Sequence, residues 1–249
     1  MLFEAPGASE YLCAAILDPE TLYQRSTSAG QPLFPERLKQ LGILPGVKPH
    51  LKVYQLPGQP AGATTMQGLD SLGARLQEYK QAGAVFAKWR APMAIDEATG
   101  MPSDLVIEAN MVDLARYALI CQDVGLVPIV EPDVSMAGTH TLEAAVAINT
   151  KIQATLYKAM LEHGVFMEGA ILKSNIVNPG KKCTTSYSVR ASHGVCCIRA
   201  GCVTEPLRRS RTLRRLTWTS SDAACPSPSG RPTSCLAGSR WRMPLRVSR

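Results

Sequence analysis

Ala84-Val-Phe-Ala-Lys-Trp-Arg90 is a short apolar segment that ends in charged residues. The same pattern recurs, at nearly equal intervals, in Leu126-Val-Pro-Ile-Val-Glu-Pro-Asp133 and in Val165-Phe-Met-Glu-Gly-Ala-Ile-Leu-Lys173. Segments that are apolar almost throughout are typical of parallel strands, which are covered by helices on one face and by other strands' side chains on the other. The pattern therefore predicts βα alternation, and its regular repetition favours a barrel over an open sheet.

A helical stretch precedes each of these predicted strands and is recognised by apolar residues at helical spacing. Each stretch ends next to a glycine, which suits the position after a helix because that position often takes a left-handed backbone. The three helices are predicted over residues 71–82, 103–124 and 141–163.

Upstream of residue 67 the pattern is weaker. Strands are predicted over residues 11–16 and 47–53, separated by a loop rich in Gly, Pro and Ser. The prediction is therefore five strands, whereas a closed TIM (β/α)8 barrel has eight. We expect an α/β protein of the TIM-barrel class whose barrel is incomplete.

Charge divides the chain into two regions. The formal net charge is +7, yet residues 190–249 alone carry +10, from twelve Arg, no Lys and two acids. This region is rich in Arg, Ser, Pro and Cys and shows no helical or strand periodicity. Such a composition is typical of translation in a wrong reading frame; a basic tail that contacts nucleic-acid phosphates is the less favoured alternative. We expect residues 1–189 to form the barrel and residues 190–249 to be disordered or frame-shifted.

The region before the tail has the features of a cytoplasmic protein. Cys13, Cys121 and Cys183 are scattered, as reduced thiols inside a cell are, and do not form the dense pattern of a small secreted domain. The N-terminus lacks the basic start and continuous apolar core of a secretory signal. No segment reaches the roughly 20 apolar residues of a membrane span. A soluble protein without membrane association is predicted.

Charged residues stand at the ends of the predicted strands, where (β/α) barrels place their reacting groups. Lys88 and Arg90 are two residues apart, as are Glu131 and Asp133, and Lys173 ends the next strand. Side chains two apart on a strand share a face, so each pair can point into the mouth of the barrel. Any one of these charges alone would more often be a solvated loop residue, but five on three successive strands indicate a site.

Two lysines near a carboxylate suit Schiff-base chemistry. A neighbouring cation and partial burial both lower the pKa of a lysine amine and free it to attack a ketone. One of the two lysines would then form the imine, and Glu131 would shuttle protons.

Three motifs also carry a family resemblance. Phe86-Ala-Lys-Trp-Arg90, Val127-Pro-Ile-Val-Glu-Pro132 and Glu168-Gly-Ala-Ile-Leu-Lys173 resemble the strand-four, strand-five and strand-six motifs of class I fructose-bisphosphate aldolases. The resemblance covers roughly residues 3–189. Further similar motifs, in the family's order, are Glu20-Thr-Leu-Tyr-Gln24, Gln67-Gly-Leu-Asp70 and Leu156-Tyr-Lys-Ala159.

The resemblance implies reversible cleavage of fructose 1,6-bisphosphate into dihydroxyacetone phosphate and glyceraldehyde 3-phosphate, with no metal or other cofactor. By motif it implies that Lys173 forms the Schiff base, that Glu131 is the acid/base that helps to dehydrate the carbinolamine, and that Lys88 is the cation beside them. It also implies that the protein is a homotetramer, as intact relatives usually are.

The resemblance implies roles for three further residues. Arg90 corresponds to a contact with a substrate phosphate. Lys48, in Gly46-Val-Lys48, is a weaker match to an active-site lysine because the residues after it diverge. Asp133 stands where the family has Glu, and its side chain is shorter by one methylene.

Together with Asp133 in place of Glu, two further departures from the family predict a truncated chain with little activity. The chain begins after the family's first barrel strand, and the similarity is lost after about Val189. One alternative is a non-catalytic aldolase-like fragment that acts as a binding or scaffold protein. Another is an imine-forming aldolase for a different sugar phosphate, against which the long match around Lys88 argues.

Other motifs predict no further chemistry. No glycine-rich nucleotide loop is present, and the cysteines after residue 190 lack the paired spacing of zinc ligands. The histidines are isolated in the sequence, which favours surface or helix-cap roles over catalysis. They are His50, His140, His163 and His193.

Overall fold

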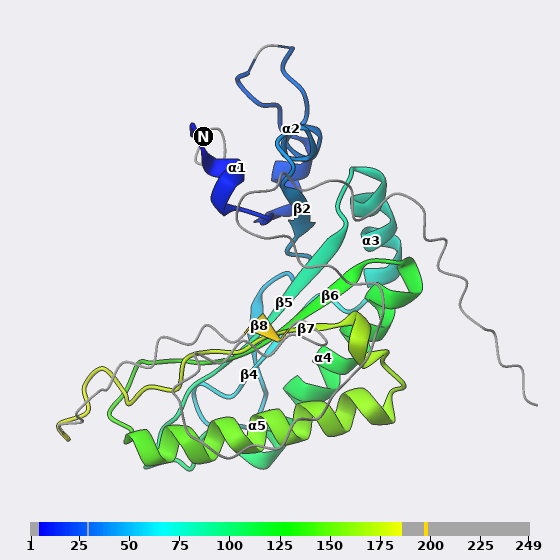
Figure 1. The fold of residues 1–249 in the computed structure, drawn as a ribbon. Coiled ribbons are helices and arrows are strands. Elements are labelled where there is room, and N and C mark those ends of the chain that lie inside the picture. Colours follow the sequence, from blue (N-terminus) through cyan, green and yellow to red (C-terminus); the bar gives the residue numbers. More distant parts are fainter. Residues whose placement is uncertain (1–4, 29, 186–196, 199–249) are drawn as a thin grey trace, which may run out of the picture. The chain divides into compact units, whose positions relative to one another are not determined.

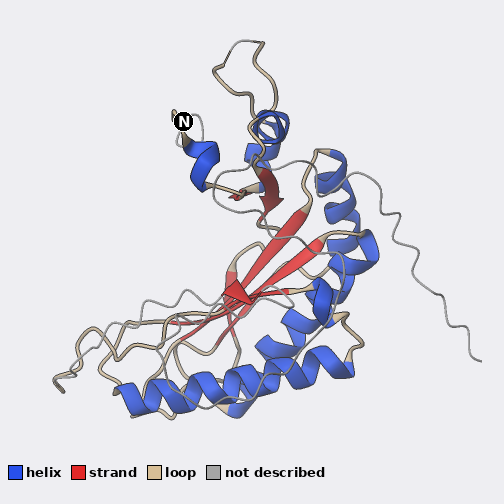
Figure 2. Cartoon of the chain, viewed as in Figure 1, coloured by secondary structure: helices blue, strands red, loops and turns tan. Residues whose placement is uncertain are grey.

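Parallel strands form a sheet in the described part of the chain (Figures 1 and 2). The computed structural model describes residues 5–28, 30–185 and 197–198. Adjacent parallel strands follow one another in sequence order, which is the arrangement that successive βα units produce in a barrel. In spatial order these strands are β1 (Ala14–Leu17), β2 (Leu44–Val47), β5 (Phe86–Met93), β6 (Val127–Val134) and β7 (Ile171–Lys173).

The β5–β6 pair is the longest ladder of this sheet and carries most of the candidate site. Its register runs without interruption from Phe86 opposite Val127 to Met93 opposite Val134. At the other edge of β5, Gly46 of β2 faces Phe86, and a Cβ atom on Gly46 would lie 2.2 Å from the Phe86 ring. A side chain at this point of β2 would therefore require the Phe86 ring to move.

Three helices alternate with these strands as predicted. They are α3 (Leu72–Gln81), α4 (Asp104–Val124) and α5 (Leu142–Glu162). Ser103 begins α4 by accepting a hydrogen bond from the Val106 amide, and Thr141 caps α5 in the same way through the Ala144 amide. Helix α4 packs on β5 and β6 and also contacts α3 and α5, as Figure 1 shows.

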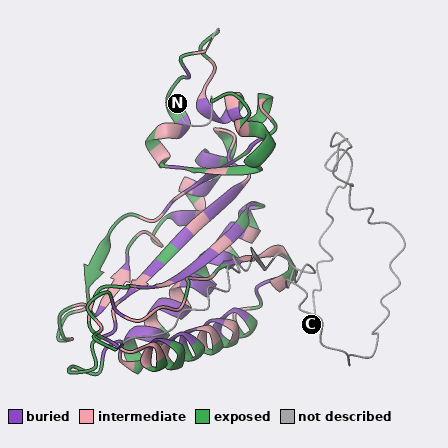
Figure 3. Ribbon diagram, turned by 60° about the vertical axis from the view of Figure 1, so that its left-hand side comes forward, coloured by how far each residue is buried: buried purple, intermediate pink, exposed green. Residues whose placement is uncertain are grey.

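The strand β5 alternates between two environments. Ala87, Trp89 and Ala91 are fully buried, and the Trp89 ring packs on Tyr117 of α4 with ring centroids 5.3 Å apart. Lys88 and Arg90 occupy the intervening positions and point to the opposite face. Figure 3 shows this banding along the central strands. The hydrophobic core on the helix side therefore fixes which face of the sheet carries the charges.

The first predicted strands are shifted in the structure. Tyr11 ends a short helix, α1 (Ala8–Tyr11), so the strand predicted over residues 11–16 is Ala14–Leu17. The strand predicted over residues 47–53 is wrong, because β2 is Leu44–Val47 and Pro49, which has no amide hydrogen, follows almost directly. Val53 instead begins β3 (Val53–Gln55), which forms an antiparallel hairpin with β4 (Thr64–Met66).

The last predicted strand is shorter than expected. The Val165 amide still donates to the carbonyl of Met160 at the end of α5, and residues Met167–Gly169 form a 3-10 helix, η3. The strand β7 therefore begins only at Ile171. Two further short elements, η2 (Pro19–Tyr23) and α2 (Phe34–Gln40), connect β1 to β2.

Most of the region 190–249 lies outside the described residues. Its described part, β8 (Cys197–Ile198), pairs antiparallel with β7, although no strand was predicted there. Its antiparallel direction sets it apart from the βα units. None of the helices in the described parts of the chain is long and apolar enough to cross a membrane.

The surface or cap roles predicted for the histidines are confirmed for one and wrong for another. His163 follows α5 as its C-cap, and its Nδ1 lies 2.7 Å from the Ala159 carbonyl, so a cap role is confirmed there. His140 is 2% exposed, because the Gly180 amide donates to its carbonyl and folds the later loop over it, so a surface role is wrong. His193 lies outside the described residues.

Candidate active site

Parallel pairing brings the charged strand ends together. Val130 of β6 lies opposite Leu172 of β7, and the residues that follow them are Glu131 and Lys173. On the other side of β6 lies β5, on which Arg90 is opposite Glu131. Lys88 lies two residues before Arg90 and therefore on the same face. The charges predicted from three separate strand ends therefore meet on one face of the sheet.

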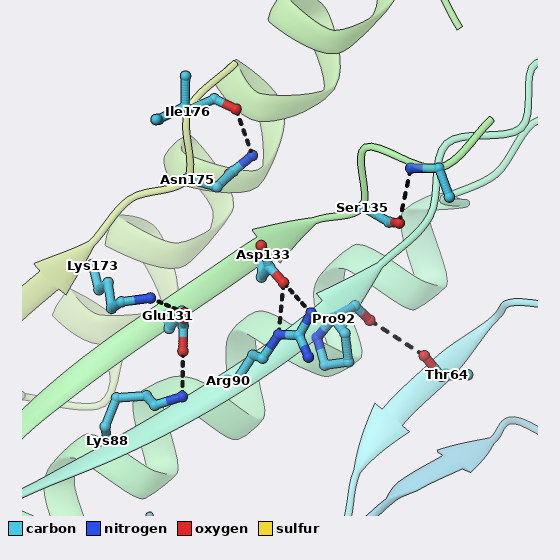
Figure 4. A network of polar contacts seen from close by, with 11 residues as sticks. Thr64, Lys88, Arg90, Pro92, Glu131, Asp133, Ser135, Lys173, Asn175 and Ile176 are labelled. Atoms are coloured by element: carbon cyan, nitrogen blue, oxygen red, sulfur yellow. Dashed lines mark hydrogen bonds and ion pairs between the residues drawn. The ribbon is translucent and has the colours of Figure 1, made fainter. Parts of the chain in front are cut away.

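Glu131 is shared by two lysines (Figure 4). Lys88 Nζ lies 2.6 Å from Glu131 Oε2, and Lys173 Nζ forms an ion pair with the other oxygen, Oε1. The Glu131 and Lys88 side chains are 9% and 12% exposed, whereas that of Lys173 is 52% exposed. The arrangement joins a buried carboxylate and a buried cation to a lysine that solvent can reach.

The charge state of Glu131 follows from these contacts. Burial, the largest single influence, raises the pKa of its carboxyl group, but hydrogen bonds from Lys173 and Lys88 and their positive charges outweigh it. The pKa of Glu131 therefore lies below its ordinary value of 4.5. At neutral pH the side chain is therefore a carboxylate that accepts hydrogen bonds from both lysines.

Arg90 and Asp133 form a second, separate pair. The Arg90 Nε donates to Asp133 Oδ2 over 2.6 Å, and Nη2 lies 2.5 Å from the same oxygen. Arg90 is far more exposed than Lys88. The prediction that one cluster unites all five charges is therefore refined: Glu131 joins the lysines, and Asp133 holds the guanidinium.

A fourth ion pair belongs to the site. Asp18 follows β1 and pairs through Oδ1 with the ammonium of Lys48, which follows β2. Lys48, a weak match by sequence, therefore lies with the stronger candidates. A cavity of about 280 Å³ opens here and is lined by Ile16, Leu17, Asp18, Lys48, Lys88 and Lys173.

Sequence reasoning missed two residues of this neighbourhood. Asp18 would have been found by the strand-end rule had the strand been placed at Ala14–Leu17 instead of at residues 11–16. His50 packs edge-on against Trp89, with ring centroids 5.9 Å apart. Burial, and after it the charges of Lys88 and Lys48, together lower the pKa of His50 to about 4, so the imidazole is neutral at pH 7.

Metal ligands do not gather in this part of the chain. Within residues 5–28, 30–185 and 197–198, no group of three or more His, Cys, Asp or Glu side chains is placed to bind an ion. The carboxylates of the site are instead occupied by ammonium and guanidinium groups.

The fold and the position of the charged cluster together define a protein of the TIM-barrel class, with its candidate site at the carboxyl ends of parallel strands. The family model for class-I fructose-bisphosphate aldolase, a glycolytic family, matches residues 1–201. This chain belongs to the class I fructose-bisphosphate aldolase family.

Individual relatives agree with this assignment. Cytosolic fructose-bisphosphate aldolase 5 of Arabidopsis thaliana is 49% identical over 180 residues, which are 72% of this chain and 49% of that protein. A probable class 1 aldolase of Xylella fastidiosa is 43% identical over 202 residues, 80% of this chain and 59% of the relative. The chain spans about half the length of the curated relatives that it matches.

A solved structure agrees as well. The aldolase of Plasmodium falciparum, crystallised with TRAP and a small-molecule inhibitor, superposes with a TM-score of 0.72 at 41% identity. The match covers 75% of this chain and 53% of the Plasmodium protein. The likeness supports the barrel class.

Proposed function

We propose that this chain acts on a sugar phosphate through a Schiff base on Lys173, in the reversible cleavage of fructose 1,6-bisphosphate to dihydroxyacetone phosphate and glyceraldehyde 3-phosphate. The observation that carries this proposal is the sharing of buried Glu131 between Lys88 and Lys173. Membership of the aldolase family supports the choice of substrate.

Accessibility favours Lys173 over Lys88 as the nucleophile. Both line the cavity, but the Lys88 side chain is 12% exposed and the Lys173 side chain is 52% exposed. A nucleophile has to reach the substrate carbon, whereas a cation that stabilises charge can remain buried. Lys88 therefore serves better as the fixed positive charge.

The first half of the reaction follows from the contact between Lys173 and Glu131. The carboxylate takes a proton from the ammonium, and the free amine attacks the ketone carbon C2 to form a carbinolamine. Lys88 stabilises the negative charge that develops on the carbinolamine oxygen. Protonated Glu131 then returns its proton to that oxygen, and the nitrogen gives up one of its own two protons to the same oxygen, which leaves as water; a protonated imine, with one hydrogen on nitrogen, remains on Lys173.

The second half breaks the carbon–carbon bond. The protonated imine accepts the electron pair of the C3–C4 bond while the 4-hydroxyl group loses its proton to Glu131. Glyceraldehyde 3-phosphate leaves, and Lys173 carries an enamine. Protonation of C3 and hydrolysis of the resulting imine release dihydroxyacetone phosphate. Arg90 and Lys48 supply positive charge for the two phosphate groups, and Asp133 orients Arg90.

The cleavage test compares the unchanged chain with Lys173→Met. The unchanged chain should form glyceraldehyde 3-phosphate from fructose 1,6-bisphosphate, measured by coupled oxidation of that product, and Lys173→Met should lose at least about a hundredfold in rate because no imine can form. Equal rates for the two proteins would reject the proposal. A chain that binds the sugar bisphosphate without imine formation or cleavage would instead be the non-catalytic binding protein of the alternative interpretation.

The remaining expectations concern the setting of this site. We propose a cytoplasmic location, supported by relatives that are named cytosolic or cytoplasmic. We also propose that residues 1–189 form the barrel region and that residues 190–249 are a tail, of which Cys197–Ile198 pairs with the edge strand β7. A homotetramer is the proposed assembly, and sedimentation equilibrium of the purified chain would test it.

A further inference from the structure

Asp18 and Lys48 directly follow the adjacent parallel strands β1 and β2, at the same edge of the sheet. Leu17 of β1 lies opposite Val47 of β2, and the Lys48 amide donates to the Leu17 carbonyl over 2.9 Å. The residue that follows β1 is Asp18, and its side chain forms an ion pair with the ammonium of Lys48. Strand register therefore sets this contact, which does not depend on a long or irregular loop.

The carboxylate of Asp18 has a local alternative that it does not use. Asp18 is the N-cap residue of the 3-10 helix η2, and aspartate is among the preferred N-cap residues because its side chain can accept a hydrogen bond from the first helical turn. Asp18 accepts no such side-chain bond. Its charge is directed to Lys48, on the wall of the cavity.

Of the six residues that line the cavity, Asp18 is the acidic one. The other polar lining residues are Lys48, Lys88 and Lys173, and the last two already share Glu131. Lys48 is therefore the lysine whose counter-ion, Asp18, itself lines the cavity. The Lys48 and Asp18 side chains are 37% and 50% exposed, so a ligand can reach both.

We propose that Asp18 is a specificity-determining residue that competes with a ligand phosphate group for the ammonium of Lys48. The proposal rests on the assignment of this cavity as a sugar-phosphate site. An ion pair as open to solvent as this one contributes at most about 1 kcal/mol, so a phosphate dianion can displace the carboxylate. Asp18 thus weakens the binding of phosphate at Lys48 and admits only ligands whose other contacts offset the displacement.

The test measures binding of inorganic phosphate by ³¹P line width at low ionic strength. Asp18→Asn removes the competing charge with almost no change in shape and should lower the dissociation constant about three- to tenfold, as expected for one unit charge a few ångströms from a phosphate near the protein surface. Asp18→Glu keeps the charge and should bind phosphate as the unchanged chain does.

A matched control separates local competition from net charge. Asp104 pairs with Lys151 on helices α4 and α5, and neither residue lines the cavity. Asp104→Asn therefore changes the net charge equally but should leave phosphate binding unchanged. In a Lys48→Met background, Asp18→Asn should give no gain, because the ammonium for which carboxylate and phosphate compete is absent.

The outcomes are decisive in either direction. A gain in Asp18→Asn that is absent from Asp104→Asn and from the Lys48→Met background supports the proposal. Unchanged or weaker binding in Asp18→Asn, an equal gain in Asp104→Asn, or a gain that persists without Lys48 would overturn it. Phosphate binding needs no imine, so failure of Schiff-base formation at Lys173 would reject the proposed reaction without deciding the role of Asp18.

Discussion

Replacing Glu131 with Gln should destabilise the protein by about 2–3 kcal/mol at pH 7. The neutral amide leaves two ammonium groups next to each other in a site where the Glu131 side chain is 9% exposed. Removing one partner from a fully buried ion pair costs about 3–5 kcal/mol. Lys88, whose side chain is 12% exposed, incurs most of that cost, but the half-exposed Lys173 can turn toward water, so the expected cost lies at or below the lower end of this range.

Urea denaturation of both proteins measures this difference, and its pH dependence identifies the cause. The pKa of Glu131 is below 4.5 in the folded protein, so its stabilisation is fully present above the unfolded pKa and is lost as the pH falls through the folded pKa. The gap between the two proteins should therefore close in acid. Asp133→Asn, which breaks the more exposed pair with Arg90, should cost less than about 1 kcal/mol. Equal stability of Glu131→Gln and the unchanged chain at pH 7 would refute the assignment of Glu131 as a shared counter-ion.

Two further predictions concern residues around the site. Gly46→Ala should lower the free energy of unfolding by about 1–3 kcal/mol, because its Cβ would lie 2.2 Å from the Phe86 ring, and Phe86→Leu should recover part of the loss in a thermal unfolding measurement. An unchanged unfolding temperature for Gly46→Ala would contradict the close approach of β2 and β5. Burial holds the pKa of His50 near 4, so the unfolded chain, with a histidine pKa of 6.5, binds the proton more readily. The contribution of the neutral imidazole to the free energy of unfolding is complete above about pH 6.5 and is lost as the pH falls through 4, by at most about 3 kcal/mol. His50→Gln should therefore make the free energy of unfolding less dependent on pH in this range. An identical pH dependence in the variant would show that His50 is not its source.

The three central βα units could be predicted from the sequence because their signals are local. Apolar residues at helical spacing and then a glycine precede each of the apolar segments that contain β5, β6 and β7. Each of these signals lies within a few neighbouring residues. The cluster around Glu131 was also within reach, since charges two apart on neighbouring parallel strands must meet at the same end of the sheet.

The features that sequence reasoning missed depend on partners far along the chain. The contact of Asp18 with Lys48 requires the register of β1 against β2, which no local pattern specifies. His140 is buried by a loop that returns some forty residues later, at Gly180. The division of the charges between Glu131 and Asp133 likewise follows from the diagonal geometry of the β5–β6 ladder, which strand-end charges alone do not determine.

The central claim is that Lys173 forms an imine with a ketose phosphate. Its most direct test is reduction by borohydride in the presence of dihydroxyacetone phosphate, followed by mass spectrometry of the proteolytic peptides. The account predicts a covalent adduct on the peptide that contains Lys173, absent when Lys173→Met is treated in the same way. No adduct, or one carried by Lys48 or Lys88, would contradict it.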